Sequence, residues 1–376
     1  MELTPKQLLA LPPQDYLLID MRNSADREYG TIPGSVACSA EQLLQEPPQT
    51  AQKLVIFCAH GVLSVEVAEQ LCQKGLSAYS LQGGYLAWLR LTMQQQEQED
   101  YCFKVEQSLR KKFKKDILSR FVKALKEYRL VNAGDKVAVC ISGGKDSMLM
   151  AKLFQELKRH SAVPFEVEYL VMDPGYNPQN RAIIEENARR LQIPIKIFET
   201  NIFESVYRVE KSPCYLCARM RRGHLYHHAQ QLGCNKIALG HHYDDVIETI
   251  LMGMLHGAQI QTMMPKLHST NFKGMELIRP LYLVREESIK AWRDYNNLHF
   301  IQCACKFTDT CTTCNNGENH SKRQETKELI RALKQSNPNV EKCIFKSVEN
   351  VNLNTVIAYK QNGLRHHFLE NYDTEV

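Results

Sequence analysis

Two adjacent glycines between a predicted strand and a predicted helix constrain the fold most strongly. The apolar strand Lys136–Ile141 runs directly into Ser142-Gly143-Gly144-Lys145-Asp146-Ser147, and helical sequence follows over Met148–Arg159. Two glycines let the main chain approach a polyphosphate, the helix N-terminus offers N–H donors, and Lys145 adds positive charge. The segment is not the nucleoside-triphosphatase loop GxxxxGKS, because its lysine follows two adjacent glycines and precedes an aspartate. It therefore predicts a polyphosphate site where a strand ends.

Two further strand ends in this region carry acidic residues. We predict strands over Val167–Met172 and Lys236–Leu239. Asp173 ends the first strand, and Gly240-His241-His242-Tyr243-Asp244-Asp245 follows the second, before a helix over Val246–Leu255. A carboxylate at such a position can reach Mg²⁺ or a reacting phosphate. Strands that alternate with helices predict an α/β fold with a doubly wound parallel sheet.

The hexamer Ser142–Ser147 resembles the PP-loop of the ATP pyrophosphatases, which split ATP into AMP and pyrophosphate and adenylate a substrate. The resemblance implies a domain like that of the adenine nucleotide alpha hydrolases, with ATP as cosubstrate and Mg²⁺ as cofactor. It also implies catalytic roles for Lys145 and Asp245. The ATP-binding residues that it implies are Ser142, Gly143, Gly144, Lys145, Asp146, Ser147, Asp173, His241, Asp244 and Asp245.

A cysteine stands between a strand and a helix in the first hundred residues. The strand Leu54–Phe57 leads into Cys58-Ala59-His60-Gly61-Val62-Leu63-Ser64, and a helix is expected through Val65–Lys74. Unpaired N–H groups and the positive end of a helix lower a thiol pKa and stabilise an anionic persulfide. From this segment alone, a buried structural cysteine is an equal alternative.

The surrounding segments favour the reactive thiol. Leu18–Arg22, Ile32–Ser35, the Cys58 loop and Leu81–Trp88 occur in that order and together resemble a single-domain rhodanese across nearly all of residues 1–95. The resemblance implies an N-terminal rhodanese-like α/β domain in which Cys58 is catalytic and carries a sulfane sulfur. His60 and Ser64 would be loop members and not acid–base groups.

The distribution of charge separates the same two parts of the chain as the motifs do. Residues 1–100 carry a net charge of −6 and the remainder carries +11, which indicates an acidic module and a basic module with a polyanionic partner. Residues 93–100 are polar without apolar periodicity and are interpreted as a linker. The predicted domains are 1–95, rhodanese-like sulfur carrier; 96–135, linker and basic helix; 136–350, PP-loop thiolation domain; and 351–376, C-terminal tail.

Nothing in the sequence indicates a membrane or secreted protein. No apolar run reaches the ~18 residues that span a bilayer. The opening sequence MELTPKQLLALPPQDY has no basic region and no long apolar segment, so it does not read as a secretion signal. We therefore expect a cytoplasmic protein with no membrane partner.

Thirteen cysteines are many for a cytoplasmic protein, in which disulfides are rare, and six of them form pairs. Pro213-Cys214-Tyr215-Leu216-Cys217 precedes three arginines, and Cys303 with Cys305 and Cys311 with Cys314 follow far downstream. A single CxxC pair fits half of a zinc site, an iron–sulfur site, a redox pair or two unrelated cysteines. A third ligand from the downstream cysteines would favour a metal site.

The motifs together look like the tRNA 2-thiocytidine synthetase family over roughly residues 104–350. They are SGGKDS, CYLCARMRRGHLY, KIALGHHYDD, IRPLYLVREESI and Ser321-Lys322-Arg323-Gln324. The resemblance implies a 4Fe–4S cluster bound by Cys214, Cys217 and one later cysteine, with the fourth iron open to hold sulfur. We favour Cys303 or Cys305, because a predicted apolar strand over His299–Gln302 would fix their position. A zinc site at Cys311 and Cys314, or one zinc bound by all four downstream cysteines, stays open.

We therefore predict an ATP-dependent tRNA sulfurtransferase that forms 2-thiocytidine at position 32 of tRNA, with a Cys58 persulfide as a sulfur relay. Its predicted partners are tRNA and a sulfur donor such as a cysteine desulfurase, and a homodimer is left open. Candidate tRNA contacts are Ser108–Tyr128, the arginines after Cys217 and Lys342–His367. The alternatives are a tRNA 2-thiouridine or 4-thiouridine synthetase and a non-catalytic, cluster-holding sulfur carrier.

Overall fold

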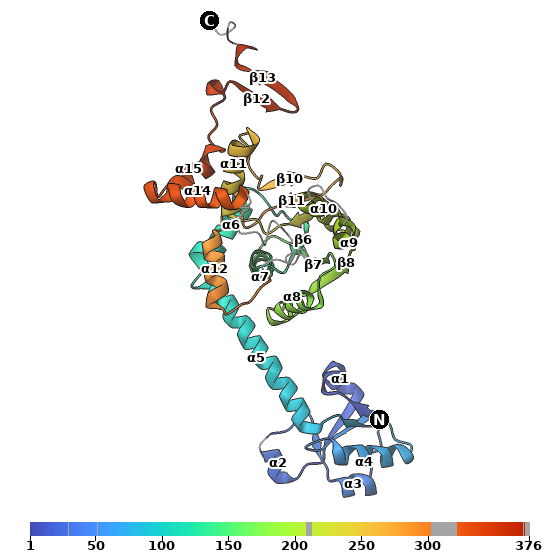
Figure 1. Cartoon of the computed structure of the whole chain (residues 1–376). Helices are drawn as coiled ribbons and strands as arrows, with labels where there is room; N and C mark the ends of the chain where they lie inside the picture. The colour runs from blue at the N-terminus through green and yellow to red at the C-terminus, as the bar shows by residue number, and fades with distance from the viewer. Residues whose placement is uncertain (29, 51, 208–212, 302–321, 371, 373–376) are drawn as a thin grey trace. The chain divides into compact units, whose positions relative to one another are not determined.

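The computed structural model describes residues 1–28, 30–50, 52–207, 213–301, 322–370 and 372 (Figure 1). The chain divides into two compact units, Met1–Tyr101 and Cys102–Val376. Each unit is built around its own parallel sheet, as the sequence predicts. No helix in the described ranges is long and apolar enough to cross a membrane.

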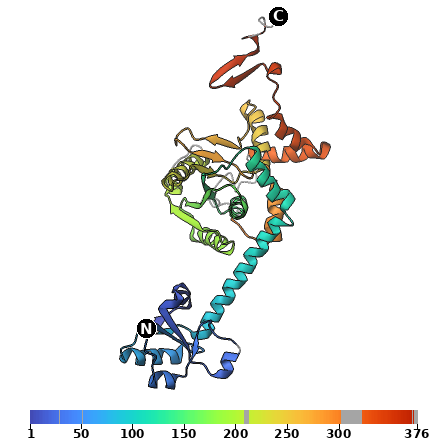
Figure 2. The same ribbon diagram turned by 180° about the vertical axis from the view of Figure 1, so that it is seen from behind.

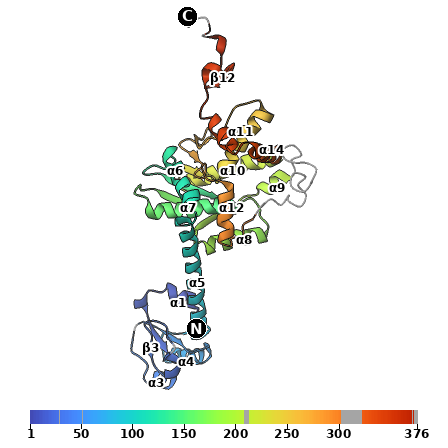
Figure 3. The same cartoon turned by 90° about the vertical axis from the view of Figure 1, so that its left-hand side faces the viewer.

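The first unit is a five-stranded parallel sheet between two layers of helices (Figure 3). Alternate residues of the central strand β4 (Lys53–Phe57) serve the two layers. Leu54 and Ile56 pack against α3 and α4, whereas Val55 and Phe57 pack against α1 and the start of α5. The other elements are β1 (Glu2–Leu3), α1 (Pro5–Ala10), β2 (Tyr16–Asp20), α2 (Ser24–Glu28), β3 (Val36–Ala37), α3 (Ala40–Gln45), α4 (Val62–Gln73) and β5 (Ala78–Leu81).

One long helix, α5 (Gly84–Arg110), begins in the first unit and ends in the second (Figure 2). It includes residues 93–100, so the stretch interpreted as a linker is helical. The stretch contains no glycine or proline, and glutamine and glutamate are good helix formers. The basic segment that follows is not a single helix either. A π-helical turn, η2 (Lys114–Leu118), precedes α6 (Ser119–Glu127).

The second unit holds a six-stranded sheet in the order β10-β11-β9-β6-β7-β8. Within the described residues of this sheet, only β10 is antiparallel to its neighbour. The strands are β6 (Lys136–Ile141), β7 (Glu166–Asp173), β8 (Ile195–Glu199), β9 (Lys236–Ala238), β10 (Lys266–His268) and β11 (Glu276–Ile278). The chain leaves β6 toward β7 and β8 and later returns to β9 on the other side of β6. The carboxyl ends of β6 and β9 therefore form the switch point where such sheets bind ligands.

Helices cover both faces of this sheet. Tyr226 and Ala229 of α10 pack against Ala138 and Cys140 of β6, whereas α7 contacts β6 and β7 and has α12 beside it (Figure 3). Helix α11 packs against α14 and α15. The helices are α7 (Lys145–His160), α8 (Pro178–Arg190), α9 (Ile202–Tyr207), α10 (Pro213–Gln231), α11 (Tyr243–Gly257), α12 (Glu286–Tyr295), α14 (Lys322–Ser336) and α15 (Val340–Ser347). The C-terminal segment forms an antiparallel hairpin of β12 (Ala358–Gln361) and β13 (Leu364–His367).

The predicted strand over residues 299–302 does not form within the described residues, which end here at Ile301. The apolar side chains find other partners. Phe300 stacks against Trp292, and the His299 carbonyl accepts a hydrogen bond from Asn187 Nδ2 at 2.8 Å. This segment is therefore held by packing against α8 and α12 and not by a sheet ladder.

Candidate active site

The phosphate loop is closed by its own last residue. Ser147 Oγ accepts a hydrogen bond from the Ser142 N–H at 3.1 Å and donates one to the Gly144 carbonyl at 2.9 Å. Gly143 has a φ of +82°, in the left-handed region where a side chain is strained. Helix α7 begins at Lys145, so the free N–H groups of its first turn face the loop. The predicted residues 142–147 therefore form one curled site at the carboxyl end of β6.

Lys145 lies between two carboxylates. Its Nζ is 3.1 Å from Asp146 Oδ2 and 3.2 Å from Glu286 Oε1, on the first turn of α12. Burial would lower the pKa of Lys145, but the two carboxylates raise it above its ordinary value. Burial would likewise raise the pKa of Glu286, and the surrounding lysines lower it to about 2. Lys145 therefore stays charged. An ammonium has three hydrogen-bond donors, and because two face the carboxylates, one is left for a phosphate.

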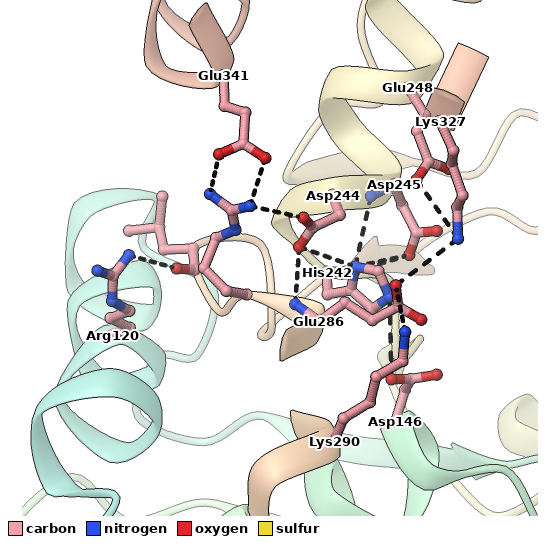
Figure 4. A network of polar contacts seen from close by, with 12 residues as sticks. Arg120, Asp146, His242, Asp244, Asp245, Glu248, Glu286, Lys290, Lys327 and Glu341 are labelled. Carbon is pink, nitrogen blue, oxygen red and sulfur yellow. Dashed lines mark hydrogen bonds and ion pairs between the residues drawn. The ribbon is translucent and has the colours of Figure 1, made fainter. Parts of the chain in front are cut away.

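The carboxylates at the start of α11 have different surroundings (Figure 4). Asp245 is joined to His242 as a reciprocal helix cap, in which its Oδ2 accepts from the His242 N–H at 2.9 Å. Both oxygens of Asp244 are taken by α12 and the residue before it, because Oδ1 lies 3.0 Å from Arg285 Nη2 and Oδ2 accepts from the Glu286 N–H at 2.7 Å. The other oxygen of Asp245, Oδ1, pairs with Arg323, and Asp245 lines a cavity together with Ser142 of the phosphate loop, whereas Asp244 fastens α12 to α11.

A cavity of ≈ 380 Å³ joins the phosphate loop to α10. Its wall includes Ser142, Asp146 and Asp245 on one side and Arg221 and Arg222 on the other. Asp146 Oδ1 is buried and has no hydrogen-bond partner in the described part of the chain. This oxygen lies 3.9 Å from His242 Nε2. A buried carboxylate oxygen without a hydrogen bond beside a phosphate loop fits Mg²⁺, which takes oxygen ligands and bridges phosphates.

His241 lines the same cavity. Its Nδ1 is also buried and has no partner among the residues that the structure describes. Burial, together with the charge of Arg279, lowers the pKa of His241 to about 4. The ring is therefore neutral at physiological pH and can offer one hydrogen bond to a ligand.

Asp173 does not line this cavity, although it lies at the carboxyl end of β7 as predicted. Its Oδ1 accepts hydrogen bonds from the N–H groups of Gly175 and Tyr176 at 2.8 and 2.7 Å, and its Oδ2 lies 3.3 Å from Arg181. Asp173 therefore holds the conformation of the loop that connects β7 to α8.

The cysteine pair lies at the start of α10. Cys214 belongs to the first turn of this helix, and Cys217 follows three residues later. Cys217 is half-buried and packs in an apolar cluster with Met172, Ile202 and Leu216. A helix N-terminus stabilises negative charge, and thiolates are the ligands that iron–sulfur clusters take. The predicted ligands Cys303 and Cys305 and the zinc candidates Cys311 and Cys314 lie outside the described residues.

The first unit presents Cys58 at the carboxyl end of β4, in the loop that precedes α4. The Gly61 N–H donates to Cys58 Sγ at 3.2 Å, and Ser64 Oγ lies 3.5 Å from the same sulfur. Burial would raise the pKa of the thiol, but the Ser64 hydroxyl and the backbone N–H groups of the loop lower it below its ordinary value. The loop is fixed by α5, whose Tyr85 N–H donates to the Cys58 carbonyl at 2.9 Å.

A second, basic cavity of ≈ 330 Å³ lies where α6 meets α15. Two of the three segments predicted to contact tRNA therefore meet in space. Its lining includes Arg120, Lys123, Lys342 and Lys346, the rings of Tyr128 and Phe345, and two glutamates, Glu127 and Glu349, which pair with Lys123 and Lys346. Cations beside aromatic rings suit both the phosphates and the bases of RNA.

Three charged residues near the site were not predicted from the sequence. Glu286 contacts Lys145, Arg285 joins Asp244 to Glu341, and Arg323 pairs with Asp245 and Glu248. They stand in IRPLYLVREESI and in Ser321-Lys322-Arg323-Gln324, which entered the sequence analysis only as parts of a resemblance. Those motifs could have marked the three residues as part of the site. The motifs could not have shown which side chains the three residues contact.

Comparison with known proteins agrees with this architecture. Residues 110–308 match the PP-loop domain, and residues 4–91 match the rhodanese-like domain. A tRNA-cytidine(32) 2-sulfurtransferase from Citrifermentans bemidjiense is 37% identical over 239 residues, which are 62% of this chain and 90% of the relative. One from Acaryochloris marina is 35% identical over 234 residues, 61% of this chain and 79% of the relative. The solved U34-tRNA thiolase NcsA from Methanococcus maripaludis, with its 4Fe–4S cluster, is 21% identical at a TM-score of 0.48, over 61% of this chain and 76% of that one.

These matches define a PP-loop enzyme that also carries a rhodanese-like domain, which confirms the fold class predicted from the sequence. The chain belongs to the tRNA-cytidine(32) 2-sulfurtransferase family. The C. bemidjiense relative as a whole is shorter than the two matched domains of this chain together, so it cannot contain both. The fusion distinguishes this chain from that relative.

Proposed function

We propose that this protein is an ATP-dependent tRNA sulfurtransferase that forms 2-thiocytidine at position 32 of tRNA. The observation that carries the proposal is the ≈ 380 Å³ cavity, which has a phosphate loop on one wall and the cysteine-bearing helix α10 on another. Adenylation and sulfur transfer need one nucleotide to meet ATP and a sulfur source in the same space. The family relationship identifies that nucleotide as a cytidine of tRNA.

ATP would bind with its phosphates on residues 142–147 and the first turn of α7. The free N–H groups and Lys145 would neutralise the charge that builds on the phosphates. We propose that Asp146 and Asp245 hold Mg²⁺ and that His241 donates or accepts a hydrogen bond within the site. Asp244 and Asp173 would act indirectly, by holding α12 and the loop after β7 in place.

The reaction would proceed in two displacements. O2 of the cytidine attacks the α-phosphorus of ATP, and pyrophosphate leaves. A sulfur nucleophile then attacks C2, the C2–O bond breaks, and AMP leaves. A 4Fe–4S cluster held by Cys214, Cys217 and either Cys303 or Cys305 would supply an open iron that holds the incoming sulfur. The zinc site at Cys311 and Cys314 stays a prediction.

Arg221 is well placed to read the target base. It lies four residues after Cys217 on α10, a spacing that puts two residues on the same face of a helix, and it lines the cavity. Its N–H donors suit O2 and N3 of cytosine, which both accept, and conflict with the N3–H of uracil. We expect Arg221→Met to reduce the preference for cytidine over uridine roughly tenfold or more. Arg219→Met, on the same helix but outside the cavity wall, should keep the preference.

The remaining partners follow from the charges and from the Cys58 loop. We propose that tRNA contacts the basic cavity between α6 and α15, where Arg120, Lys123, Lys342 and Lys346 lie on the rim. Cys58 would receive sulfur as a persulfide from a donor such as a cysteine desulfurase and pass it on for thiolation, and a thiol reductant would supply the two electrons that bring this sulfur to the sulfide level. We propose that the enzyme acts in the cytoplasm, where its tRNA substrates are, and a homodimer stays a prediction.

Reconstitution in vitro tests the proposal. Anaerobically purified protein, ATP, Mg²⁺ and sulfide are incubated with a tRNA transcript that carries cytidine at position 32 or with one that carries uridine there. We expect AMP formation and 2-thiocytidine with the first transcript and neither with the second. Thiolation of the uridine transcript would favour the thiouridine alternative. Retention of a cluster without any AMP formation would favour a sulfur carrier.

A further inference from the structure

We propose that Arg323 occupies Asp245 while the metal site is empty and withdraws to Glu248 when Mg²⁺ binds. The inference rests on the proposed function only in that Asp245 is a metal ligand, and it adds the residue that controls access to this ligand. Arg323 stands on the first turn of α14, and the two carboxylates stand one turn apart on α11.

Both oxygens of the Asp245 carboxylate have partners, but the two partners differ in how easily they can leave. Oδ2 accepts from the His242 N–H at 2.9 Å and completes the cap of α11. Oδ1 lies 2.5 Å from Arg323 Nη2, on a side chain that is 46% exposed. Release of Oδ2 would uncap the helix, whereas release of Oδ1 requires only that one side chain moves. Oδ1 is therefore the oxygen for a metal, and repulsion between two cations at one oxygen displaces Arg323.

Glu248 is in place to receive the displaced guanidinium. Arg323 Nε lies 2.7 Å from Glu248 Oε2, so Arg323 touches this carboxylate while it still holds Asp245. The side chain of Glu248 is only 3% exposed. Because a buried carboxylate without a cation is costly, Arg323 stays with Glu248 after it leaves Asp245.

The second oxygen of Glu248 is only loosely held. Its Oε1 lies 3.6 Å from the Nζ of Lys327, one turn after Arg323 on α14 (Figure 4). The same Nζ lies 3.7 Å from Glu286 Oε2, so Lys327 has another carboxylate nearby. Both separations exceed a hydrogen-bond distance. Arg323 can therefore take both oxygens of Glu248, in the bidentate pairing that suits a guanidinium.

This exchange disfavours a metal ion in a site without nucleotide. A metal that binds alone has to displace Arg323 from Asp245, and this cost lowers its affinity. The phosphates of ATP supply further oxygen ligands to Mg²⁺ and strengthen its binding. Mg²⁺ therefore enters mainly together with ATP.

The test measures metal binding to the full-length protein without nucleotide. Mn²⁺ replaces Mg²⁺, and the electron paramagnetic resonance signal of free Mn²⁺ gives the affinity. Asp245→Asn identifies this site and should lower the affinity roughly tenfold or more. Arg323→Gln should raise it at least roughly fivefold, whereas Arg323→Lys, which keeps the charge, should stay closer to the wild type. Lys334→Gln is the matched control, because it removes a 44% exposed cation of the same helix that pairs with Glu341, and it should change nothing.

A double-mutant cycle tests the role of Glu248. Glu248→Gln leaves Arg323 without its second carboxylate and should lower the Mn²⁺ affinity roughly fivefold. In the Arg323→Gln background the same change should have little effect, because the cation that Glu248 receives is gone. An equal effect in both backgrounds would show that Glu248 acts only as a nearby negative charge, and it would overturn the exchange.

The same measurements separate this proposal from the proposed function. If Asp245→Asn lowers the Mn²⁺ affinity but folded Arg323→Gln binds Mn²⁺ like the wild type, the metal site stands and the exchange is wrong. If Asp245→Asn binds Mn²⁺ like the wild type, Asp245 is not a ligand, and both the metal role and the exchange are overturned. Thermal unfolding of each variant shows that it is folded.

Discussion

Replacing Gly143 with alanine tests the geometry of the phosphate loop. A methyl group there would lie 2.6 Å from Ile184 Cγ1 and 2.7 Å from Ile301 Cδ1, and φ at this residue is +82°. The left-handed conformation costs a non-glycine residue roughly 1–2 kcal/mol, and overpacking costs about 1–3 kcal/mol. We therefore expect Gly143→Ala to destabilise the second unit by about 2–5 kcal/mol, or roughly 5–15 °C in Tm.

The assay is thermal unfolding of the full chain, with and without ATP. The transition that ATP shifts belongs to the unit that binds it. Gly144→Ala is the matched control, because φ at Gly144 is −80° and the nearest atom to its added methyl lies 3.6 Å away. It should cost less than about 1 kcal/mol. If Gly144→Ala is as stable as expected but loses ATP turnover, the added methyl group crowds the phosphates of ATP and does not disturb the fold.

Truncation of Ile184 should partly relieve the clash. In a double-mutant cycle with Ile184→Ala, we expect Gly143→Ala to be less damaging than in the wild type by at least about 1 kcal/mol. Equal stability of Gly143→Ala and the wild type, or equal damage by the two glycine variants, would refute the reasoning from φ and contact distance.

Three further predictions concern the two thiol sites and the phosphate loop. Lys145→Ala should abolish AMP formation, measured by chromatography, while Cys58→Ala leaves it intact, and normal turnover by Lys145→Ala would exclude the phosphate-loop role. Cys214→Ser and Cys217→Ser should each lose the iron and sulfide of the anaerobically purified protein, and full retention would exclude them as ligands. Alkylation of Cys58 should rise with pH through a midpoint below that of free cysteine, since its pKa is lowered. Ser64→Ala should move that midpoint upward, and an unchanged midpoint would refute the assigned cause.

The local sequence was sufficient to predict those parts of the structure that a single continuous segment determines. Strand β6, the loop at Gly143 and the start of α7 follow from an apolar run, two glycines and a helical pattern in direct succession. The Cys58 loop follows in the same way from β4, Gly61 and α4. In both, the chemistry depends on the backbone of a strand-to-helix turn, which adjacent residues specify.

Contacts between distant segments were not predictable from the sequence. Asp244 and Asp245 are adjacent, yet Asp244 pairs with Arg285 and fastens α12, whereas Asp245 pairs with Arg323 of α14. The segment that ends at Ile301 has the composition of a strand, but packing against Gly143 replaced sheet pairing. Residues 93–100 lack apolar periodicity, yet helix propensity and the flanking helical turns continue α5 through them.

The central claim is that this chain thiolates a cytidine of tRNA with sulfur that passes through Cys58. Nucleoside mass spectrometry of tRNA tests it most directly, in cells that carry the wild-type gene, no gene, or the gene for Cys58→Ala. We expect 2-thiocytidine to disappear without the gene and to fall strongly in Cys58→Ala, while the thiouridines stay unchanged. Unchanged 2-thiocytidine without the gene, or the loss of a thiouridine in its place, would contradict the account.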